Sequence, residues 1–197
     1  SGTRNYLHAV TYRNGLFVAV GYGGTILTST DGTSWTERTS GTSEFLSEVT
    51  YGNGLFVTVG FNGIILTSPD GITWTKITSG TSAYLLTGVT YGNGLYVAVR
   101  EDRTILTSSD GNSWTKRTSG ASGPFRGITY GNGLFVTVGA MGTIFTSPDG
   151  TTWTEITSGT RNYLHAVTYR NGLFVAVGED GTILTSSDGN SWTKRTS

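Results

Sequence analysis

The sequence predicts an all-β protein: a five-bladed β-propeller with four antiparallel strands in each blade. Three observations predict it. Five copies of one unit of about 40 residues tile the chain, each copy reads as four short strands, and no stretch shows helical periodicity. The 30 glycines also disfavour helices. A four-stranded unit of this length, repeated around an axis, is a propeller blade, and five lies within the usual range of about four to eight.

The copies are marked by tryptophan. The five tryptophans of the chain each close the phrase Ser-x-Asp-Gly-x-x-Trp, at steps of 39 or 40 residues. They divide the chain into blades 1–39, 40–78, 79–118, 119–157 and 158–197, which we expect to form a single β-propeller domain. The third blade carries one extra residue before its first strand. A linear β-solenoid is the alternative, disfavoured because solenoid ends need atypical caps, whereas the first and last copies here are the most alike.

Each copy alternates apolar runs with turn signals. The strands of the first copy are expected at residues 7–12, 16–20, 25–28 and 34–38. The pair Asn14-Gly15 predicts a type I′ hairpin turn, because both central residues of that turn need positive φ. The second strand is almost continuously apolar and should be buried on both faces. The pair Asp31-Gly32 turns the chain into a half-solvated fourth strand.

The tryptophan phrase, preceded by Val-Gly-x-x-Gly-Thr-Ile-Leu-Thr, resembles the Asp-box of bacterial neuraminidase repeats. It is also similar to the repeats of photosystem II assembly-factor-like propellers, although the usual Asp-box has one more residue between Asp and Trp. The resemblance implies a folding device. The chemistry agrees, because an Asp carboxylate can accept hydrogen bonds from its own turn and the Trp can pack on the neighbouring hairpin. The residues assigned this structural role are Asp31, Trp35, Asp70, Trp74, Asp110, Trp114, Asp149, Trp153, Asp188 and Trp192.

No cofactor and no metal site is predicted. Calcium takes about six to eight oxygen ligands, which one Asp in each turn does not supply. His8 and His165 occupy the same position in blades 1 and 5, and they are interpreted as two copies of one duplicated residue.

Composition narrows the class of partner. Thirteen basic and thirteen acidic residues give a formal net charge of zero, which argues against a nucleic-acid partner. The longest apolar runs have the length of a strand, so no membrane span and no membrane partner are expected. Charged residues are only 13% of the chain, so Thr, Ser, Asn and Gly must cover the surface. Such surfaces are common in extracellular β proteins, and a natural protein of this composition is expected outside the cell or on its surface.

The blades differ mainly in two segments: the one that leads into the first strand and the break between the second and third strands. In an up-and-down blade both lie at the same end, opposite the Asn-Gly and Asp-Gly turns. Variation therefore collects on one face, around the mouth of the central channel, and its residue types suit recognition. The candidate binding face consists of Tyr6, Tyr22, Phe45, Phe61, Tyr84, Arg103, Phe125, Arg126, Met141 and Tyr163.

These features predict a non-enzymatic binding or interaction module whose ligand is a glycan or a protein. An engineered or reconstructed near-symmetric scaffold with no ligand ranks level with it, because residues 1–21 and 158–178 are identical. A sialidase-like glycosidase is a distant alternative, since no arginine triad is recognisable and no catalytic residue is assigned. No terminal strand crosses from the last blade to the first. The chain is therefore either a monomer closed by packing of blade 1 against blade 5, or a homo-oligomer that shares blades.

Overall fold

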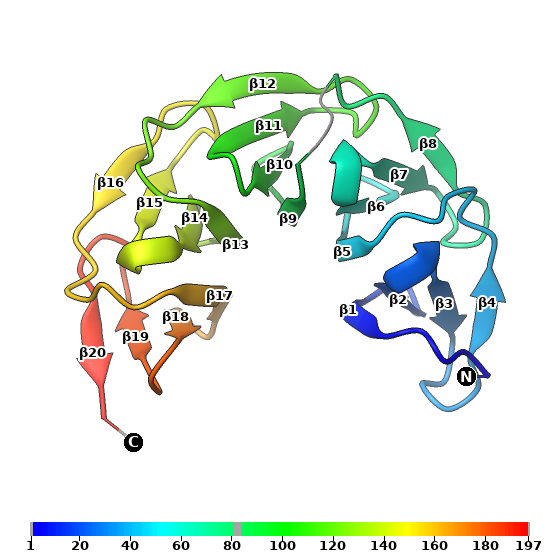
Figure 1. Ribbon diagram of the computed structural model, residues 1–197, viewed down its shortest axis with the longest axis horizontal. Coiled ribbons are helices and arrows are strands. Elements are labelled where there is room, and N and C mark those ends of the chain that lie inside the picture. Colours follow the sequence, from blue (N-terminus) through cyan, green and yellow to red (C-terminus); the bar gives the residue numbers. More distant parts are fainter. Residues whose placement is uncertain (1, 81–83, 197) are drawn as a thin grey trace.

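The computed structural model describes residues 2–80 and 84–196, which form an arc of five four-stranded antiparallel sheets (Figure 1). This confirms the predicted all-β fold class and the five blades. In every sheet the strand order follows the chain, and the first strand lies nearest the centre of the arc. The segment predicted to lead into the third blade lies partly at 81–83, outside the described residues. No helix in the described part of the chain is long and apolar enough to cross a bilayer.

The first three blades have the same order of strands. Blade 1 contains β1 (Leu7–Arg13), β2 (Leu16–Gly21), β3 (Ile26–Ser29) and β4 (Thr36–Arg38). Blade 2 contains β5 (Leu46–Gly52), β6 (Leu55–Gly60), β7 (Ile65–Ser68) and β8 (Thr75–Ile77). Blade 3 contains β9 (Leu86–Gly92), β10 (Leu95–Arg100), β11 (Thr104–Ser108) and β12 (Thr115–Thr118).

The last two blades have the same order of strands. In addition, short 3-10 turns join the second and third strands of blades 1, 2 and 4. Blade 4 contains β13 (Phe125–Gly131), β14 (Leu134–Gly139), β15 (Ile144–Ser147) and β16 (Thr154–Ile156). Blade 5 contains β17 (Leu164–Arg170), β18 (Leu173–Gly178), β19 (Ile183–Ser186) and β20 (Thr193–Arg195). The 3-10 turns are η1 (Tyr22–Gly24), η2 (Phe61–Gly63) and η3 (Ala140–Gly142).

Two local features recur in every blade. The hairpin between the first two strands has positive φ at both central residues, 55° at Asn14 and 76° at Gly15, as a type I′ turn requires. The first strand also carries a β-bulge, which in blade 1 shifts the register between Leu7 and Ala9. Corresponding shifts occur in β5, β9, β13 and β17. A bulge re-aims the side chain that it carries.

The hydrophobic core lies between blades. We call the side that a blade turns to the next blade its front face, and the opposite side its back face. At the first seam, Val18, Val20 and Ile26 on the front face of blade 1 pack against blade 2. The back face of blade 2 contributes Val49 and Phe56, among others, to the same cluster. Equivalent clusters fill the other three seams, so each blade is stabilised by its neighbours.

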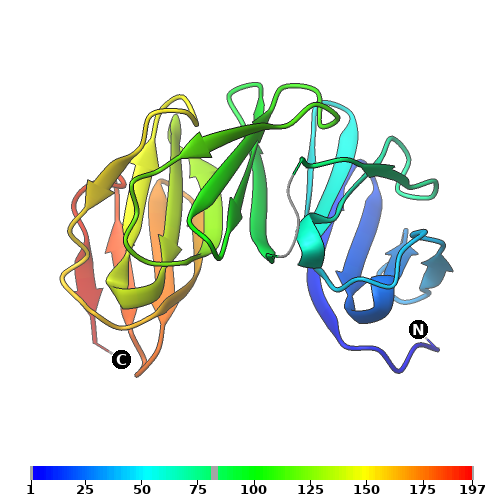
Figure 2. The same ribbon diagram turned by 45° about the horizontal axis from the view of Figure 1, so that its top comes forward.

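The arc is open between blade 5 and blade 1 (Figures 1 and 2). Among the described residues no hydrophobic cluster joins these two blades. Val10 on the back face of blade 1 is 61% exposed, whereas its counterpart Val49 in blade 2 is 4% exposed. On the front face of blade 5, Val177 is 42% exposed, against 0% for its counterpart Val20. Packing of blade 1 against blade 5, one of the two predicted ways to close the ring, is therefore absent from the described structure.

The same substitution at two equivalent positions should report this difference. Val49→Ala should lower the free energy of unfolding by about 2 kcal/mol, because it removes buried methyl groups from a filled seam. Val10→Ala should change it by no more than about 0.5 kcal/mol, because that side chain faces solvent. Chemical denaturation of both variants provides the measurement. Equal losses would show that Val10 is buried in solution and would contradict an exposed back face of blade 1.

Candidate functional site

The end of each blade that carries the Asp-Gly turn is held by its own hydrogen bonds. In blade 1 one carboxylate oxygen of Asp31 accepts the backbone N–H groups of Thr33 and Ser34, both at 2.8 Å. The same oxygen accepts the Ser29 hydroxyl at 3.0 Å. The indole nitrogen of Trp35 donates to the Gly32 carbonyl at 3.1 Å. All these side chains are occupied within one turn, and the turns at Asp70, Asp110, Asp149 and Asp188 have the same plan.

The hydrogen bonds also set the charge state of these carboxyl groups. Backbone N–H groups of Ser113 and Asn112 lower the pKa of Asp110 to about 2. The backbone N–H groups of Ser191 and Asn190 do the same for Asp188. A carboxylate that accepts several N–H groups is stabilised in its ionised form. The carboxylates of Asp110 and Asp188 are therefore held ionised by hydrogen bonds within their own turns.

At the ends of the blades opposite the Asp-Gly turns, the centre of the arc contains a hollow of about 510 Å³, to which every blade contributes. Five of its lining residues sit at the β-bulges of the first strands, where the bulge turns them toward the centre. These residues are His8, Ser47, Thr87, Arg126 and His165. The rest of the lining comes from Phe45, Leu85, Tyr163 and Glu179. The hollow has the size of a small-ligand or peptide side-chain pocket, and its wall mixes apolar, basic and acidic groups.

Polar side chains at the β-bulges also form hydrogen bonds between neighbouring blades. Nδ1 of His8 lies 2.8 Å from the carbonyl oxygen of Ser47 in the next blade. The hydroxyl of Ser47 donates to the carbonyl of Leu86, and the hydroxyl of Thr87 donates to the carbonyl of Phe125 at 3.1 Å. The residue at the bulge thus reaches across a seam and lines the hollow at the same time.

Aromatic rings gather beside the hollow where blades 1 and 2 meet. The ring of Tyr22 stacks on Phe45 with centroids 4.4 Å apart. Tyr6 meets Tyr22 edge-on at 6.1 Å, and His8 meets Phe45 edge-on at 5.1 Å. Tyr6 is 80% exposed, so this aromatic group presents a free ring at the rim.

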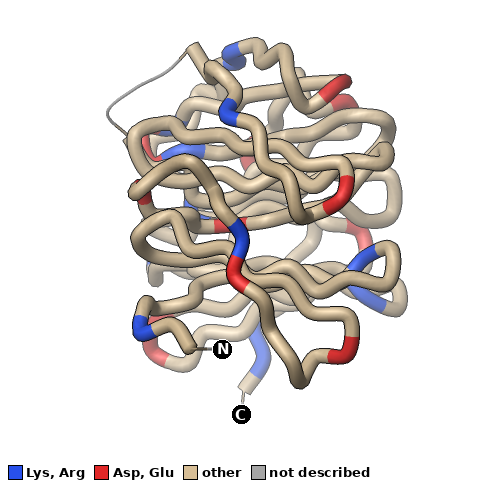
Figure 3. The backbone as a smooth tube through the Cα atoms, turned by 90° about the vertical axis from the view of Figure 1, so that its right-hand side faces the viewer, with Lys and Arg blue, Asp and Glu red and all other residues tan. Residues whose placement is uncertain are grey.

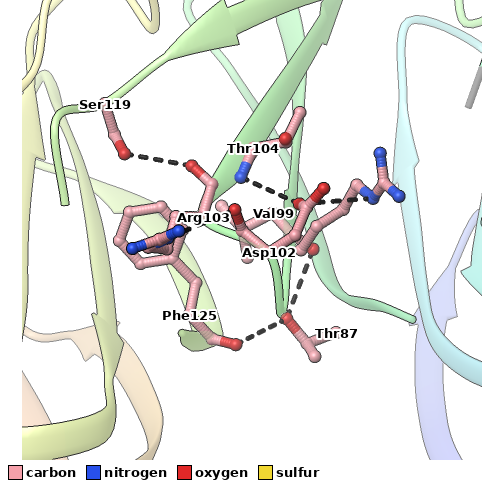
Figure 4. A network of polar contacts seen from close by, with 8 residues as sticks. Thr87, Val99, Asp102, Arg103, Thr104, Ser119 and Phe125 are labelled. Atoms are coloured by element: carbon pink, nitrogen blue, oxygen red, sulfur yellow. Dashed lines mark hydrogen bonds and ion pairs between the residues drawn. The ribbon is translucent and has the colours of Figure 1, made fainter. Parts of the chain in front are cut away.

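Blade 3 departs from its neighbours by carrying a charged loop, residues 100–103, which begins at the last residue of β10 and leads into β11 (Figure 4). Arg100 and Arg103 stand where the other blades have glycine. Arg103 keeps the left-handed backbone of the glycines at its own position in the other blades, with φ of 72°, a strained conformation for a residue with a side chain. The carboxylate of Asp102 accepts the Thr104 N–H at 3.1 Å. Strained residues often mark functional positions, which directs attention to this loop.

The charged loop connects to the hollow through an ion pair. Glu101 binds Arg126 at 2.7 Å, and Arg126 lines the hollow. Arg100 is buried, with Nε 3.6 Å from a carboxylate oxygen of Asp102 and its guanidinium 5.3 Å from the centre of the Tyr84 ring. Elsewhere Lys and Arg are interspersed with Asp and Glu along the backbone (Figure 3).

The predicted binding-face residues are only partly brought together. Phe45, Arg126 and Tyr163 line the hollow, and Tyr6 and Tyr22 join the aromatic group beside it. The remaining exposed members lie away from the hollow lining: Phe61, Tyr84, Arg103 and Met141.

Phe125 corrects one expectation, because it is fully buried and packs against Phe145 in the third seam. The position at the rim is taken by Pro124, whose carbonyl accepts the Ala140 N–H. The equivalent bond in blade 1 runs from Tyr22 N–H to the carbonyl of Tyr6. Phe125 therefore occupies the position of Leu7, seven residues before the Asn-Gly turn, and not the position of Tyr6.

The five bulge residues that line the hollow were not predicted as a set from the sequence. The signal was present, because the second residue of the first strand, between apolar or small residues in most copies, is polar in all five. It also missed Glu48, which follows the bulge in blade 2 where the other blades have Ala or Gly. Burial raises the pKa of Glu48 to about 7, although its carboxylate accepts the Val49 N–H at 3.0 Å.

Comparisons with known proteins place the chain by its fold. No protein-family model matches it, and no curated protein matches its sequence. Among solved structures, YCF48 from Cyanidioschyzon merolae matches with a TM-score of 0.73 and 16% identity, over 98% of this chain and 73% of that one. A structure of YCF48 bound to D1 peptide gives 0.74 and 20%, over 98% and 67% of the two chains.

Two further structures have the same fold. The computationally designed Ika8 protein matches with a TM-score of 0.77 and 15% identity, over 99% of this chain and 63% of its own. The WD40 β-propeller domain of Doa1 matches with 0.77 and 16%, over 98% and 68%. The chain is thus similar in fold to YCF48, WD40 and designed propellers, which bears out the predicted likeness to assembly-factor propellers at the level of fold.

The lowered pKa of the turn carboxylates predicts an acid-dependent effect. A carboxyl group with a depressed pKa in the folded state stabilises the fold above its unfolded pKa of about 3.9, and this contribution is lost as the pH falls toward 2. Asp110→Asn should therefore lower the melting temperature at pH 7, and the difference from wild type should shrink toward pH 2. Glu37→Gln, at an exposed carboxylate outside the turns, is the control. A difference that stays constant from pH 7 to pH 2 would contradict a role for the charge.

Glu48 predicts the opposite dependence on pH. Its raised pKa means that the folded state holds the proton more tightly than the unfolded chain does, so stability falls as the pH rises from about 4.5 to about 7. Glu48→Ala, which introduces the residue found in blades 1 and 5, should raise the melting temperature relative to wild type at pH 8 more than at pH 4. Thermal unfolding followed by circular dichroism is the measurement. A gain that does not change with pH would mean that the carboxyl is not desolvated.

Proposed function

We propose that the chain is a non-catalytic binding module that holds an extended peptide segment across the mouth of the central hollow. The observation that carries the proposal is the hollow itself, to which each of the five blades contributes at least one bulge side chain. Binding sites on a rigid scaffold concentrate in its variable loops, and here these loops form the rim.

The chemistry of the lining favours a peptide over a highly charged ligand. Phe45 and Tyr163 offer apolar ring surface, while Arg126 and Glu179 offer one charge of each sign. A peptide brings apolar side chains together with backbone donors and acceptors, which suits a wall of this composition. The solved complex of YCF48 with D1 peptide adds support, since a protein of the same fold is there bound to a peptide.

The proposal is tested by selecting ligands without prior choice. A phage library of random linear peptides is panned against the folded chain, and enriched peptides are labelled and titrated by fluorescence polarisation. Tyr163→Ala and Arg126→Ala should weaken binding by roughly tenfold or more, as expected for central contact residues. Phe61→Ala, an exposed aromatic on the same face but outside the hollow lining, should leave it unchanged.

The competing functions give different results. Binding on a glycan array with no peptide enriched would favour the carbohydrate alternative, for which exposed Tyr6 is the leading stacking residue. The absence of any ligand in both screens would favour a near-symmetric scaffold without a ligand, as the identity of residues 1–21 and 158–178 already suggests. Equal loss of peptide binding in Tyr163→Ala and Phe61→Ala would place the site outside the hollow.

A further inference from the structure

The opening of the arc is bordered by two unpartnered apolar faces. On the back face of blade 1, Leu7, Val10 and Tyr12 are exposed. A groove of about 290 Å³ lies on this face, lined partly by Leu7, Val10 and Trp35. On the front face of blade 5, Leu173 and Val177 are exposed. Contiguous apolar surface of this kind on a folded protein marks an interaction site.

The two faces carry the same residues as the faces that meet inside the arc. Leu7, Val10 and Tyr12 correspond to Leu46, Val49 and Tyr51 on the back face of blade 2, which pack in the first seam. The front face of blade 5 repeats the front face of blade 1, Leu16, Val18, Val20 and Ile26, as Leu173, Val175, Val177 and Ile183. Both free faces are therefore already shaped for the complementary face of another blade of this repeat.

The residues at the β-bulges give an independent indication that the free faces fit another blade of this repeat. In the first seam the ring of His8 reaches the Ser47 carbonyl of the next blade. His165 holds the same position in blade 5, where it is exposed at the edge of the opening. A further blade of this repeat would present its own backbone carbonyl there. It would provide the free front face with both an apolar partner and a hydrogen-bond acceptor for His165.

The room available limits what can fill the opening. Nearly the whole of this chain superposes on 63–73% of longer propeller chains. If the remainder of those chains is made of similar blades, a full ring holds about seven or eight, and about two or three are missing here. A second copy of this chain brings five blades. It could not occupy the space without forcing the filled seams apart.

We propose that the two free faces are a docking interface for blades of this same repeat, and that a segment of two or three such blades completes the ring. One end of the segment packs on Leu173 and Val177 and accepts a hydrogen bond from His165. Its other end packs on Leu7, Val10 and Tyr12. The contacts are those of the seams already present, and no new chemistry is needed.

The test extends the full chain with two of its own blades. Residues 41–118 are appended after Ser197, which takes the place of Ser40, so that the junction repeats a native connection. The added blades are attached beside blade 5, and β1 lies at the far end of the polypeptide. Hydrogen exchange in β1 therefore reports closure of the ring and not the attachment itself.

Closure predicts three results. Amides of β1 (Leu7–Arg13) should exchange roughly tenfold or more slowly in the fusion protein than in the parent chain. The melting temperature should rise, and light scattering should show a monomer. In the matched fusion protein with Val10→Lys, protection of β1 should be lost, while protection of β18 (Leu173–Gly178) should remain, because only the blade 1 seam is disrupted.

Other outcomes would overturn the proposal. A folded fusion protein whose β1 exchanges as fast as in the parent chain would show that added blades do not reach blade 1. A parent chain that forms a discrete dimer, with β1 and β18 both protected at high concentration, would assign the faces to a second copy. If the two-blade extension fails to fold, a three-blade extension, residues 41–157 after Ser197, is measured in the same way, and unprotected β1 in both would reject ring completion.

Discussion

The structure depends on one contact, the apolar packing of the front face of each blade against the back face of the next. A four-stranded sheet with two apolar faces cannot bury them alone, so each blade takes its stability from its neighbours. The inner strands come close enough that Gly127 in β13 has little room for a side chain beside Ala166 of β17. This packing makes the core a series of four layers and not a single centre. It also leaves one face uncovered at each end of the arc.

The two ends of each blade are held by different kinds of hydrogen bond. At the turn end, the Asp carboxylate, the Ser hydroxyl and the Trp indole satisfy one another within a few residues, so this end tolerates little change. At the other end the chain is held mainly by backbone hydrogen bonds, such as that from Tyr22 to Tyr6. Backbone bonds place few demands on side-chain identity, which explains why the blades vary there.

The fold could be predicted almost completely from the sequence, because its signals are local. The Asn14-Gly15 turn, the apolar second strand and the period of the tryptophans each depend on residues close together in the chain. The site was less accessible. Phe125 was expected at the rim but lies in the core, at the buried position that Leu46 holds in blade 2. The bulge that turns His8 and Thr87 inward depends on pairing with a neighbouring strand.

Ring closure could not be predicted for a different reason. The sequence shows which faces are apolar, but the angle between two blades is set by the combined shape of the side chains in their seam. Small differences at one seam are repeated at every seam, so they decide whether five blades span a circle or only part of one. Here Leu, Val and Ile face Leu, Val and an aromatic residue in seam after seam, and the result is an open arc.

The opening and the hollow both depend on the angle between neighbouring blades. The bulge residues lie on the innermost strands, where the spacing between blades sets the width of the hollow. His8 in β1 and His165 in β17 are two of these bulge residues, and β1 and β17 border the opening from its two sides (Figure 1). Blades 1 and 5 are therefore not the packed neighbours that a closed five-bladed ring would make them. In each of the first three blades one inner strand provides both a contact across a seam and part of the lining of the hollow, so the packing of the blades and the shape of the hollow are coupled.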